Sequence, residues 1–225
     1  MISARHLTKR YGHQTVLNSI SVDFRRGRVS YLLGPNGSGK TTLFKCLLGL
    51  ENYSGAVRYN GRHLAEVRGQ VFPVFDDCAL YPQLSGLENL RFLLGRSVGW
   101  EEVQAVVKGT LDETDMHRPS RTLSNGQRKK VYAVGLLLAR PSYVFLDELA
   151  NGLDYDSLQW LKEVIEELRK DSVVIASGHQ FEFYERVADD VFAISQNGLK
   201  KIDFHHTDGD RLEDAYATLR ANRPR

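Results

Sequence analysis

The sequence carries almost no net charge, which limits the partners that it can attract. Its 225 residues include 30 lysines and arginines against 28 aspartates and glutamates. Proteins that bind nucleic acid usually carry a marked basic surplus, so we expect no nucleic acid among the partners. The basic end, residues 219–225, is expected to be a frayed terminus rather than a binding arm.

Cysteines and long apolar runs are also scarce. Cys46 and Cys78 fit no metal-binding spacing, so free core thiols in a reducing compartment are expected. Residues 1–10 show no apolar stretch behind their charges, unlike a secretory signal. The longest apolar run, residues 132–139, falls far short of the ~20 residues that span a bilayer. We therefore expect a soluble cytoplasmic chain that reaches a membrane only through a partner.

The pattern of apolar residues predicts one α/β domain over residues 1–225. The first third alternates extended runs with turn signals, which predicts a largely antiparallel layer. These runs are residues 2–12, 19–27, 28–37 and 55–61, with a helix at 40–50. The second half predicts buried strands at 143–147 and 172–177, helices at 156–170 and 180–187, a hairpin at 196–198 and a last helix at 210–221. Strands joined by helices predict a three-layer core.

The middle of the chain differs from both halves. Residues 84–122 show short amphipathic helical patterns with no strand between them. A small α-helical subdomain over about residues 84–140 is therefore expected within the single domain.

A glycine-rich loop, GPNGSGKTT, lies between an apolar strand and a helix. It matches the pattern G-x-x-x-x-G-K-[ST] in the context that pattern needs. Its glycines let backbone N–H groups converge on phosphates, while Lys40 places a charge on them and Thr41 ligates Mg²⁺. The alternative is a glycine-rich turn with an incidental lysine. The residues assigned to the nucleotide here are Gly34, Asn36, Gly37, Ser38, Gly39, Lys40, Thr41 and Thr42.

Two carboxylates and one histidine end the later strands. Asp147 is placed to hold the Mg²⁺ shell, and Glu148, one residue further, to polarise the attacking water. His179 follows the next strand, where ligands of doubly wound sheets gather. Acidic residues also end strands where a chain leaves the core, and a single histidine is often structural, so both alternatives stay open here.

A second loop, TLSNGQRKK at residues 122–130, has the features of a phosphate-binding helix start. Ser124 is a good N-cap, and the positive end of the following helix favours an anion. The loop lacks the lysine and hydroxyl of a complete site. A capped helix without a ligand is the alternative.

Taken together, these motifs resemble those of the ATP-binding subunits of ABC transporters. GPNGSGKT resembles the Walker A motif, LSNGQ the signature motif with Asn125 in third place, and YVFLDE the Walker B motif with Glu148 as catalytic glutamate. NGLD, ending in Asp154, is similar to the D-loop, SGH to the H-loop with His179, and Tyr11 to the aromatic residue that stacks on adenine. The resemblance runs over nearly the whole chain in the family's order.

The resemblance implies an ABC ATPase fold, namely a P-loop core with an antiparallel β subdomain and a helical subdomain. It implies ATP and Mg²⁺ as ligands, catalysis by Glu148, His179 and Lys40, and a transmembrane permease partner that docks after residues 79–82. It also implies a head-to-tail homodimer, or a heterodimer with a related ATPase. In this dimer the signature loop completes the ATP site of the other subunit. The additional nucleotide-contacting residues are Tyr11, Ser124, Gly126, Gln127 and Asp154.

Two positions depart from the family pattern. Asp76 occupies the place of the Q-loop glutamine, and Leu149 follows Glu148 where the family has proline. A shorter, charged side chain at position 76 is expected to meet Mg²⁺ through water and to make nucleotide binding depend strongly on the metal.

The subclass indicated is that of drug- and lipid-exporter-like ATPases, which have segments similar to residues 84–93 and 212–219. Two rival functions are an ABC ATPase that works away from transport, for example in a division complex, and a nucleotide-gated module that turns over little. Glu148 and His179 are both present, which disfavours the second rival.

Overall fold

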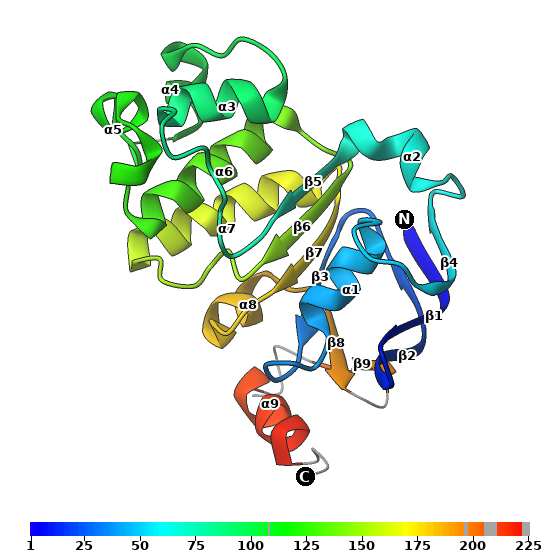
Figure 1. The fold of residues 1–225 in the computed structure, drawn as a ribbon. Helices are drawn as coiled ribbons and strands as arrows, with labels where there is room; N and C mark the ends of the chain where they lie inside the picture. Colours follow the sequence, from blue (N-terminus) through cyan, green and yellow to red (C-terminus); the bar gives the residue numbers. More distant parts are fainter. Residues whose placement is uncertain (108, 196–197, 205–210, 222–225) are drawn as a thin grey trace.

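The computed structural model describes residues 1–107, 109–195, 198–204 and 211–221, and it contains two β-sheets flanked by helices (Figure 1). The strands are β1 (Ile2–Tyr11), β2 (Gln14–Phe24), β3 (Arg28–Leu33), β4 (Ser54–Tyr59), β5 (Val71–Val74), β6 (Tyr143–Asp147), β7 (Val173–Ser177), β8 (Asp190–Ser195) and β9 (Gly198–Ile202). A three-stranded antiparallel sheet has the order β2-β1-β4, and a six-stranded sheet has the order β5-β6-β7-β3-β8-β9.

The strand at residues 28–33 was predicted in the antiparallel layer, and this prediction is wrong. The strand β3 lies inside the six-stranded sheet, parallel to both β7 and β8. The reason is its burial, because five of its six residues are buried and both of its faces are covered. A continuous apolar strand of this kind suits a parallel sheet that is covered on both sides.

The six-stranded sheet separates two hydrophobic cores. Along β6, Val144 and Leu146 enter one core, while Tyr143 and Phe145 enter the other. The first core is built mainly from the helices that follow residue 85, and the second from α1 (Lys40–Leu47) and the antiparallel sheet. The three-layer arrangement that the alternation of strands and helices predicts is confirmed.

Nine α-helices and two short 3₁₀-helices are assigned in the described part of the chain. They are α1 (Lys40–Leu47), α2 (Leu64–Val67), η1 (Arg68–Gln70), α3 (Gly86–Leu94), α4 (Trp100–Val107), α5 (Glu113–His117), η2 (Ser120–Thr122), α6 (Asn125–Ala139), α7 (Tyr155–Arg169), α8 (Phe181–Val187) and α9 (Leu212–Ala221). Helices α3 to α6 gather in one lobe beside the edge strand β5 (Figure 1). We call this group the helical lobe.

The sequence pattern missed the short elements between β4 and the helical lobe. Strand β5 has only four residues and contains Pro73, which cannot donate a ladder hydrogen bond. Its place at the sheet edge makes that proline tolerable, since an edge strand needs partners on one side only.

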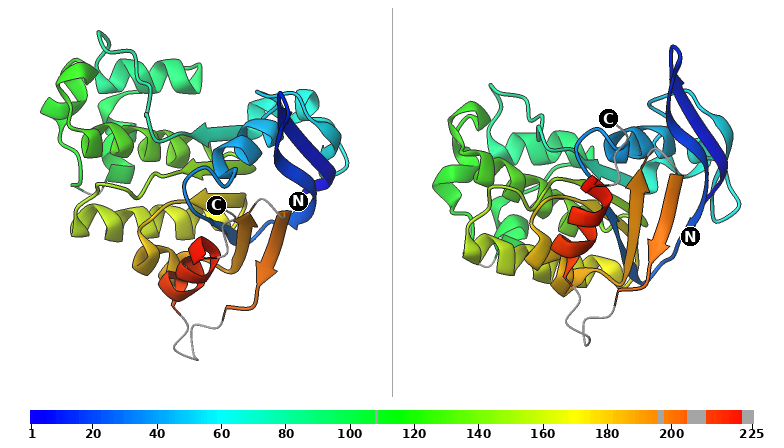
Figure 2. Two further views of the ribbon diagram at one scale, coloured as in Figure 1. Left: turned by 60° about the horizontal axis from the view of Figure 1, so that its bottom comes forward. Right: turned by 90° about the horizontal axis from the view of Figure 1, so that it is seen from below.

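The carboxyl-terminal part forms a hairpin and a last helix. Strands β8 and β9 pair antiparallel up to Ser195 and Gly198, which confirms the predicted hairpin, although its residues 196–197 lie outside the described residues. Helix α9 packs against α8 (Figure 2). Residue 210, the predicted first residue of this helix, and residues 222–225 of the basic end also lie outside the described residues.

The structure can be compared with the predictions made from the two cysteines and from the short apolar runs. Cys46 and Cys78 are buried and free, as expected. Among the described residues, the structure has no helix long and apolar enough to cross a membrane.

Candidate active site

The glycine-rich loop joins the central strand β3 to α1 and leads directly into the helix. Gly39 has φ of 105°, and a Cβ there would lie 2.8 Å from Leu17 Cδ2, so the turn requires glycine. Lys40 is buried, and its Nζ donates to the carbonyl oxygens of Gly34 at 2.6 Å and Pro35 at 3.4 Å. Ser38 Oγ is buried without a hydrogen-bond partner in the described structure. An orphaned hydroxyl beside a cradle of backbone amides fits a phosphate ligand.

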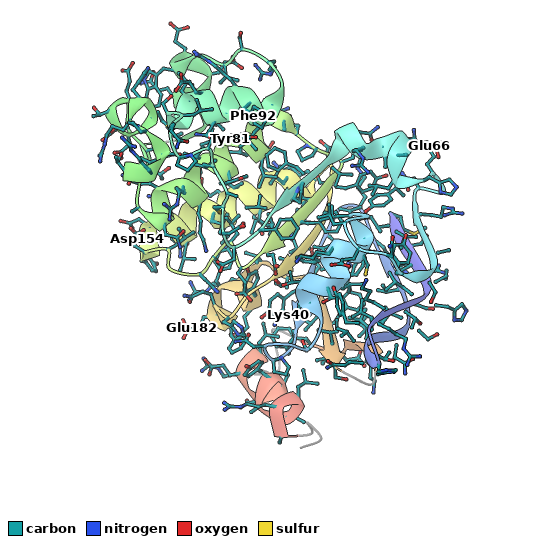
Figure 3. The ribbon with its side chains drawn as sticks, viewed as in Figure 1. Lys40, Glu66, Tyr81, Phe92, Asp154 and Glu182 are labelled. Carbon is teal, nitrogen blue, oxygen red and sulfur yellow. The ribbon has the colours of Figure 1, made fainter. Side chains whose placement is uncertain are left out.

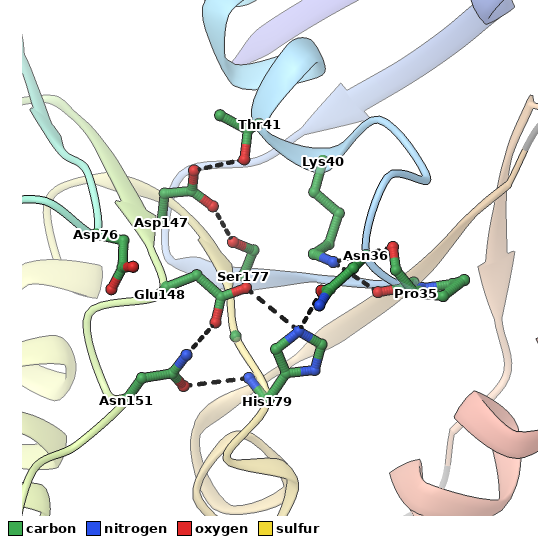
Figure 4. A network of polar contacts seen from close by, with 12 residues as sticks. Pro35, Asn36, Lys40, Thr41, Asp76, Asp147, Glu148, Asn151, Ser177 and His179 are labelled. Atoms are coloured by element: carbon green, nitrogen blue, oxygen red, sulfur yellow. Dashed lines mark hydrogen bonds and ion pairs between the residues drawn. The ribbon is translucent and has the colours of Figure 1, made fainter. Parts of the chain in front are cut away.

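The first carboxylate, Asp147, meets the loop across the sheet. Thr41 Oγ1 donates to its Oδ2 at 2.8 Å, and Ser177 Oγ donates to its Oδ1 (Figure 4). Strand pairing aligns Asp147 of β6 with Ser177 of β7. A hydroxyl and a carboxylate side by side fit Mg²⁺, which proteins usually hold through one or two carboxylates plus substrate phosphates. Among the described residues there is no cluster of three or more histidine, cysteine, aspartate or glutamate side chains that could hold a metal ion.

The second carboxylate, Glu148, belongs to a separate network. The Asn151 amide donates to Glu148 Oε2, and its own oxygen accepts from the His179 backbone N–H at 3.4 Å (Figure 4). His179 Nε2 lies 3.6 Å from Glu148 Oε1 and 2.9 Å from Asn36 Oδ1. Three segments that are distant in sequence thereby meet, namely the phosphate loop, the loop at residues 148–151 and the residue His179 after β7. The sequence motifs did not single out Asn151, although it begins the NGLD segment.

Two buried tyrosines fix the backbone that leads to His179. Tyr31 donates to the carbonyl of Gly178 and Tyr184 to that of Ser177, each at 2.7 Å. Their rings stack with centroids 4.4 Å apart. Burial raises the pKa of both hydroxyls well above the usual value, so they remain donors at physiological pH. A Cβ at Gly178 would lie 2.6 Å from Tyr184 Cε2, so this packing needs glycine.

Helix α9 reaches the same histidine from the other side. The Tyr216 ring lies edge-on to His179 with centroids 5.9 Å apart, and 5.1 Å from the Phe181 ring. Leu212, at the start of α9, is fully buried, and its N–H donates to Glu185. The last helix therefore helps to place His179, a contact that the sequence analysis did not predict.

The signature loop forms the start of α6, as expected. Ser124 caps the helix by accepting from the Gln127 N–H at 3.1 Å, and Gln127 Oε1 accepts from the Ser124 N–H at 2.8 Å. The Gln127 amide nitrogen also donates to Asp115. Gly126 adjoins the D-loop, since a Cβ there would lie 3.6 Å from Leu153 Cδ2. Ser124 is exposed, whereas the Gln127 side chain is occupied within its own subunit.

The remaining nucleotide candidates lie at the start of α7 and at the end of β1. Asp154 caps α7 by accepting from the Ser157 N–H at 2.8 Å, and hydrogen bonding to the side chain and the backbone of Ser157 lowers the pKa of Asp154. Tyr11 is 44% exposed at the end of β1, with Lys9 Nζ 4.5 Å from its ring centroid. It interacts with Thr42, which follows Thr41 in α1, so Tyr11 lies at the rim of the phosphate loop.

Asp76 lies at the border of this network (Figure 4). Its side chain is 63% exposed, and Oδ1 forms an ion pair with Lys129 Nζ at 3.2 Å. The sequence analysis did not single out Lys129. A water-mediated role of Asp76 at Mg²⁺ stays a prediction, and the ion pair gives its charge a partner within the chain.

A phosphate loop between a central parallel strand and a helix, opposite a strand-end aspartate, defines the chain as a P-loop nucleoside triphosphatase. The family model described as ABC transporter matches residues 17–151. The chain belongs to this family and is an ATP-binding, ATP-hydrolysing protein of the kind that serves as a transporter subunit.

Curated relatives include transport proteins of different kinds. The chain is 30% identical over 198 residues to the lantibiotic transport ATP-binding protein SrtF of Streptococcus pyogenes, and the match covers 84% of each chain. It is 32% identical over 219 residues to the sulfate/thiosulfate import ATP-binding protein CysA of Escherichia coli, covering 90% of this chain but 60% of that protein.

Solved structures share the fold. A structure titled as the ATP-binding subunit of an ABC transporter aligns with a TM-score of 0.84 and 25% identity, covering 98% of this chain and 99% of that chain. The dimeric structure of MJ0796, a bacterial ABC transporter cassette, aligns with a TM-score of 0.79 and 21% identity, covering 91% of this chain and 100% of that chain.

Proposed function

We propose that this chain hydrolyses ATP to power export of a substrate through a separate transmembrane permease. The observation that carries the ATPase part is the meeting of Thr41 with Asp147 and of Glu148 with His179, at the carboxyl ends of three adjacent strands. Mg²⁺, once bound with the nucleotide, would neutralise charge on the phosphate oxygens. Lys40 and the loop amides bind the phosphates, and Glu148 accepts a proton from the attacking water.

The histidine network supports this division of roles. His179 lies close enough to both Glu148 and Asn36 to bridge the carboxylate and the phosphate loop. Asn151 holds Glu148 and His179 in one orientation, because its amide bonds to both. We propose that Glu148 acts on water, while His179 and Asn151 keep that water and the γ-phosphate in place.

The second half of the nucleotide site is proposed to come from another subunit. Ser124 is exposed at the amino end of α6, where backbone N–H groups and the helix dipole favour an anion. MJ0796, which shares the fold, is dimeric. A head-to-tail dimer of this chain, or a heterodimer, would place Ser124 and Gly126 at the phosphate of the partner.

The helical lobe offers a docking surface for the permease. Tyr81 and Phe92 are 48% and 60% exposed, and their rings touch edge-on with centroids 4.6 Å apart (Figure 3). Two large apolar side chains paired on the surface are typical of a protein interface. The segment that begins at Asp76 runs directly into Tyr81, so this surface is joined to the active site through few residues.

Recovery of a membrane protein with this chain tests the transport role. We expect the tagged protein to co-purify with an integral membrane subunit from detergent-solubilised membranes of its own cells. The double variant Tyr81→Asp/Phe92→Asp should lose that subunit and keep its basal ATPase activity, whereas Leu50→Asp, at an exposed apolar residue on another surface, should keep both. A double variant that retains the membrane subunit would contradict the docking surface.

The proposed direction of transport is export. Its support is the similarity of residues 84–93 and 212–219 to segments of exporter ATPases, and the even coverage of the match with SrtF. In cells that lack this chain, the substrate should accumulate inside if the direction is export and outside if it is import. Mass spectrometry of small molecules in cells and medium measures the difference.

A further inference from the structure

Lys129 is a buried charged residue that no motif explains. It lies in the second turn of α6, four residues after the exposed loop at 122–125, and only 1% of its side chain is exposed. A buried ammonium is costly unless its three N–H groups all find acceptors. In this structure each of the three N–H groups of the Lys129 ammonium has an acceptor.

Its three acceptors come from two segments, the loop at residues 148–151 and the segment at Asp76. The Lys129 ammonium donates to the carbonyl oxygens of Glu148 and Asn151, each at 2.8 Å, and to Asp76 Oδ1 at 3.2 Å. We call this arrangement the Lys129 clamp. It uses every donor of the ammonium, and Asp76 supplies the opposite charge. Burial raises the pKa of the nearby Cys78 thiol to about 12, and the positive charge of Lys129 opposes that rise.

The first acceptor belongs to the residue assigned to water activation. Glu148 has φ of 59°, the left-handed region, which is unusual for a residue with a side chain. Such backbone conformations persist only where the surroundings hold them, and they are concentrated at active sites. The Glu148 N–H donates to the Ser177 carbonyl at 3.1 Å. Lys129 holds the other end of the same residue, at its carbonyl oxygen.

The second acceptor holds the partner of that carboxylate. The side chain of Asn151 bonds to Glu148 and to the His179 backbone, and its carbonyl oxygen is fixed by Lys129. The clamp therefore sets the positions of both Glu148 and Asn151 from one point. Without it, two backbone carbonyls would lose their charged donor inside the protein.

We propose that Lys129 is a positioning residue that holds Glu148 and Asn151 in their reactive arrangement, with Asp76 as its charged anchor. The proposal rests on the proposed role of Glu148 in activating water. Asp76 stands in the place of the family's Q-loop glutamine, and here its charge serves the clamp. Asp76 is also the first residue of the segment that leads to Tyr81. A movement of the docking surface formed by Tyr81 and Phe92 can therefore be transmitted through Asp76 and Lys129 to Glu148.

The main variant is Lys129→Met, which keeps the length of the side chain and removes all three donors. We expect kcat to fall at least ~10-fold with KM for ATP changed by less than ~3-fold, because a positioning loss affects the reaction and not the binding of phosphates. Lys129→Gln keeps amide donors and should lose less. Asp76→Ala should also lose less than Lys129→Met, since two of the three bonds remain. Lys130→Met, which removes the neighbouring ammonium from the Thr110 carbonyl, is the matched control and should stay within ~2-fold of wild type.

A combination with Glu148→Gln separates positioning from stability. If the clamp acts through Glu148, adding Lys129→Met to the Glu148→Gln variant should lower the rate of single-turnover hydrolysis by less than a further ~2-fold. Equal losses in both backgrounds would overturn the clamp. An unchanged rate for Glu148→Gln alone would instead overturn the role of Glu148. Should Lys129→Met not fold, as judged by circular dichroism, Lys129→Gln and Asp76→Ala provide the same comparison.

Discussion

Asp147 and Glu148 are adjacent in sequence, but the fold gives their side chains different hydrogen-bond partners. Asp147 ends β6 and accepts hydrogen bonds from the hydroxyls of Thr41 and Ser177, and a carboxylate beside hydroxyls offers the oxygen ligands that Mg²⁺ prefers. Glu148 has left the strand with a left-handed backbone, so its side chain turns towards Asn151 and His179. We propose a metal-binding role for Asp147 and a water-activating role for Glu148, and the backbone turn at Glu148 is what separates the two side chains.

Replacement of Glu148 by glutamine tests that separation. Glu148→Gln should keep the affinity for ATP, because Lys40 and the loop amides are intact, and lower turnover by at least ~10²-fold, the usual scale for a general base. The protein should then accumulate as a closed dimer with ATP. Nucleotide titration, ATPase assay and gel filtration measure these effects, and a parallel loss of binding and turnover would be evidence against the assignment.

At the scale of elements, the strand order β6-β7-β3 decides where the chemistry occurs. Parallel strands bring their carboxyl ends to one edge, so the phosphate loop, Asp147 and His179 converge without being close in sequence. On the other side of β3, ion pairs link β8 to β3 and to β9. Asp190 pairs with Arg28 of β3 and Lys201 of β9, each at 2.6 Å. This pairing has a consequence for pH.

Stability should depend on Asp190 above its unfolded pKa. Burial by itself would raise the pKa of Asp190, but the bonds from Arg28 and Lys201 outweigh it and hold the pKa below its ordinary value. A lowered folded pKa adds stability above the unfolded pKa, and this stability is lost as the pH falls through the folded value. Asp190→Asn should therefore lower the free energy of unfolding by about 1.5–3 kcal/mol at pH 7, and by much less below about pH 3.

Urea unfolding at the two pH values measures this difference. Asp23→Asn is the control, since Asp23 forms an exposed pair with Arg5 and should cost no more than about 1 kcal/mol at either pH. A loss for Asp190→Asn that is the same at both pH values would mean that the charge of Asp190 does not contribute.

At the scale of the whole molecule, the two proposed halves of the ATP site lie on different surfaces of the chain. The phosphate loop follows the carboxyl end of the central strand β3, whereas the signature loop starts α6 in the helical lobe (Figure 1). A head-to-tail pair would bring the loop of one subunit to the signature of the other. Each completed site then draws residues from two chains.

Mixing two inactive variants tests this shared site. Ser124→Arg chains and Lys40→Ala chains should each be inactive alone, and their heterodimers should contain one doubly damaged site and one intact site. ATPase activity should therefore return when the two are mixed. Lys40→Ala mixed with the double variant Lys40→Ala/Ser124→Arg is the control, because none of its dimers has an intact site. Heterodimers that form without any activity would count against sites shared between subunits, provided that one intact site suffices for turnover.

The sequence by itself determined the features that depend on near neighbours. The phosphate loop needs glycines within a few residues of Lys40, and the capping pair of Ser124 and Gln127 needs a spacing of three, so both are visible in the letters. The long apolar strands, the three layers and the final helix were predictable for the same reason. These patterns are set by backbone geometry and by burial.

Only the tertiary structure decided which residues support those motifs. Thr41 and Asp147 are 106 positions apart, and Lys129 contacts Asp76 across 53. Nothing local marks Lys129, Asn151 or Ser177, because each acquires its role from the strand order that brings it beside Glu148 or Asp147. The position of β3 was mistaken for the same reason, since period and burial identify a strand but its neighbours in a sheet are chosen by the packing of the whole chain.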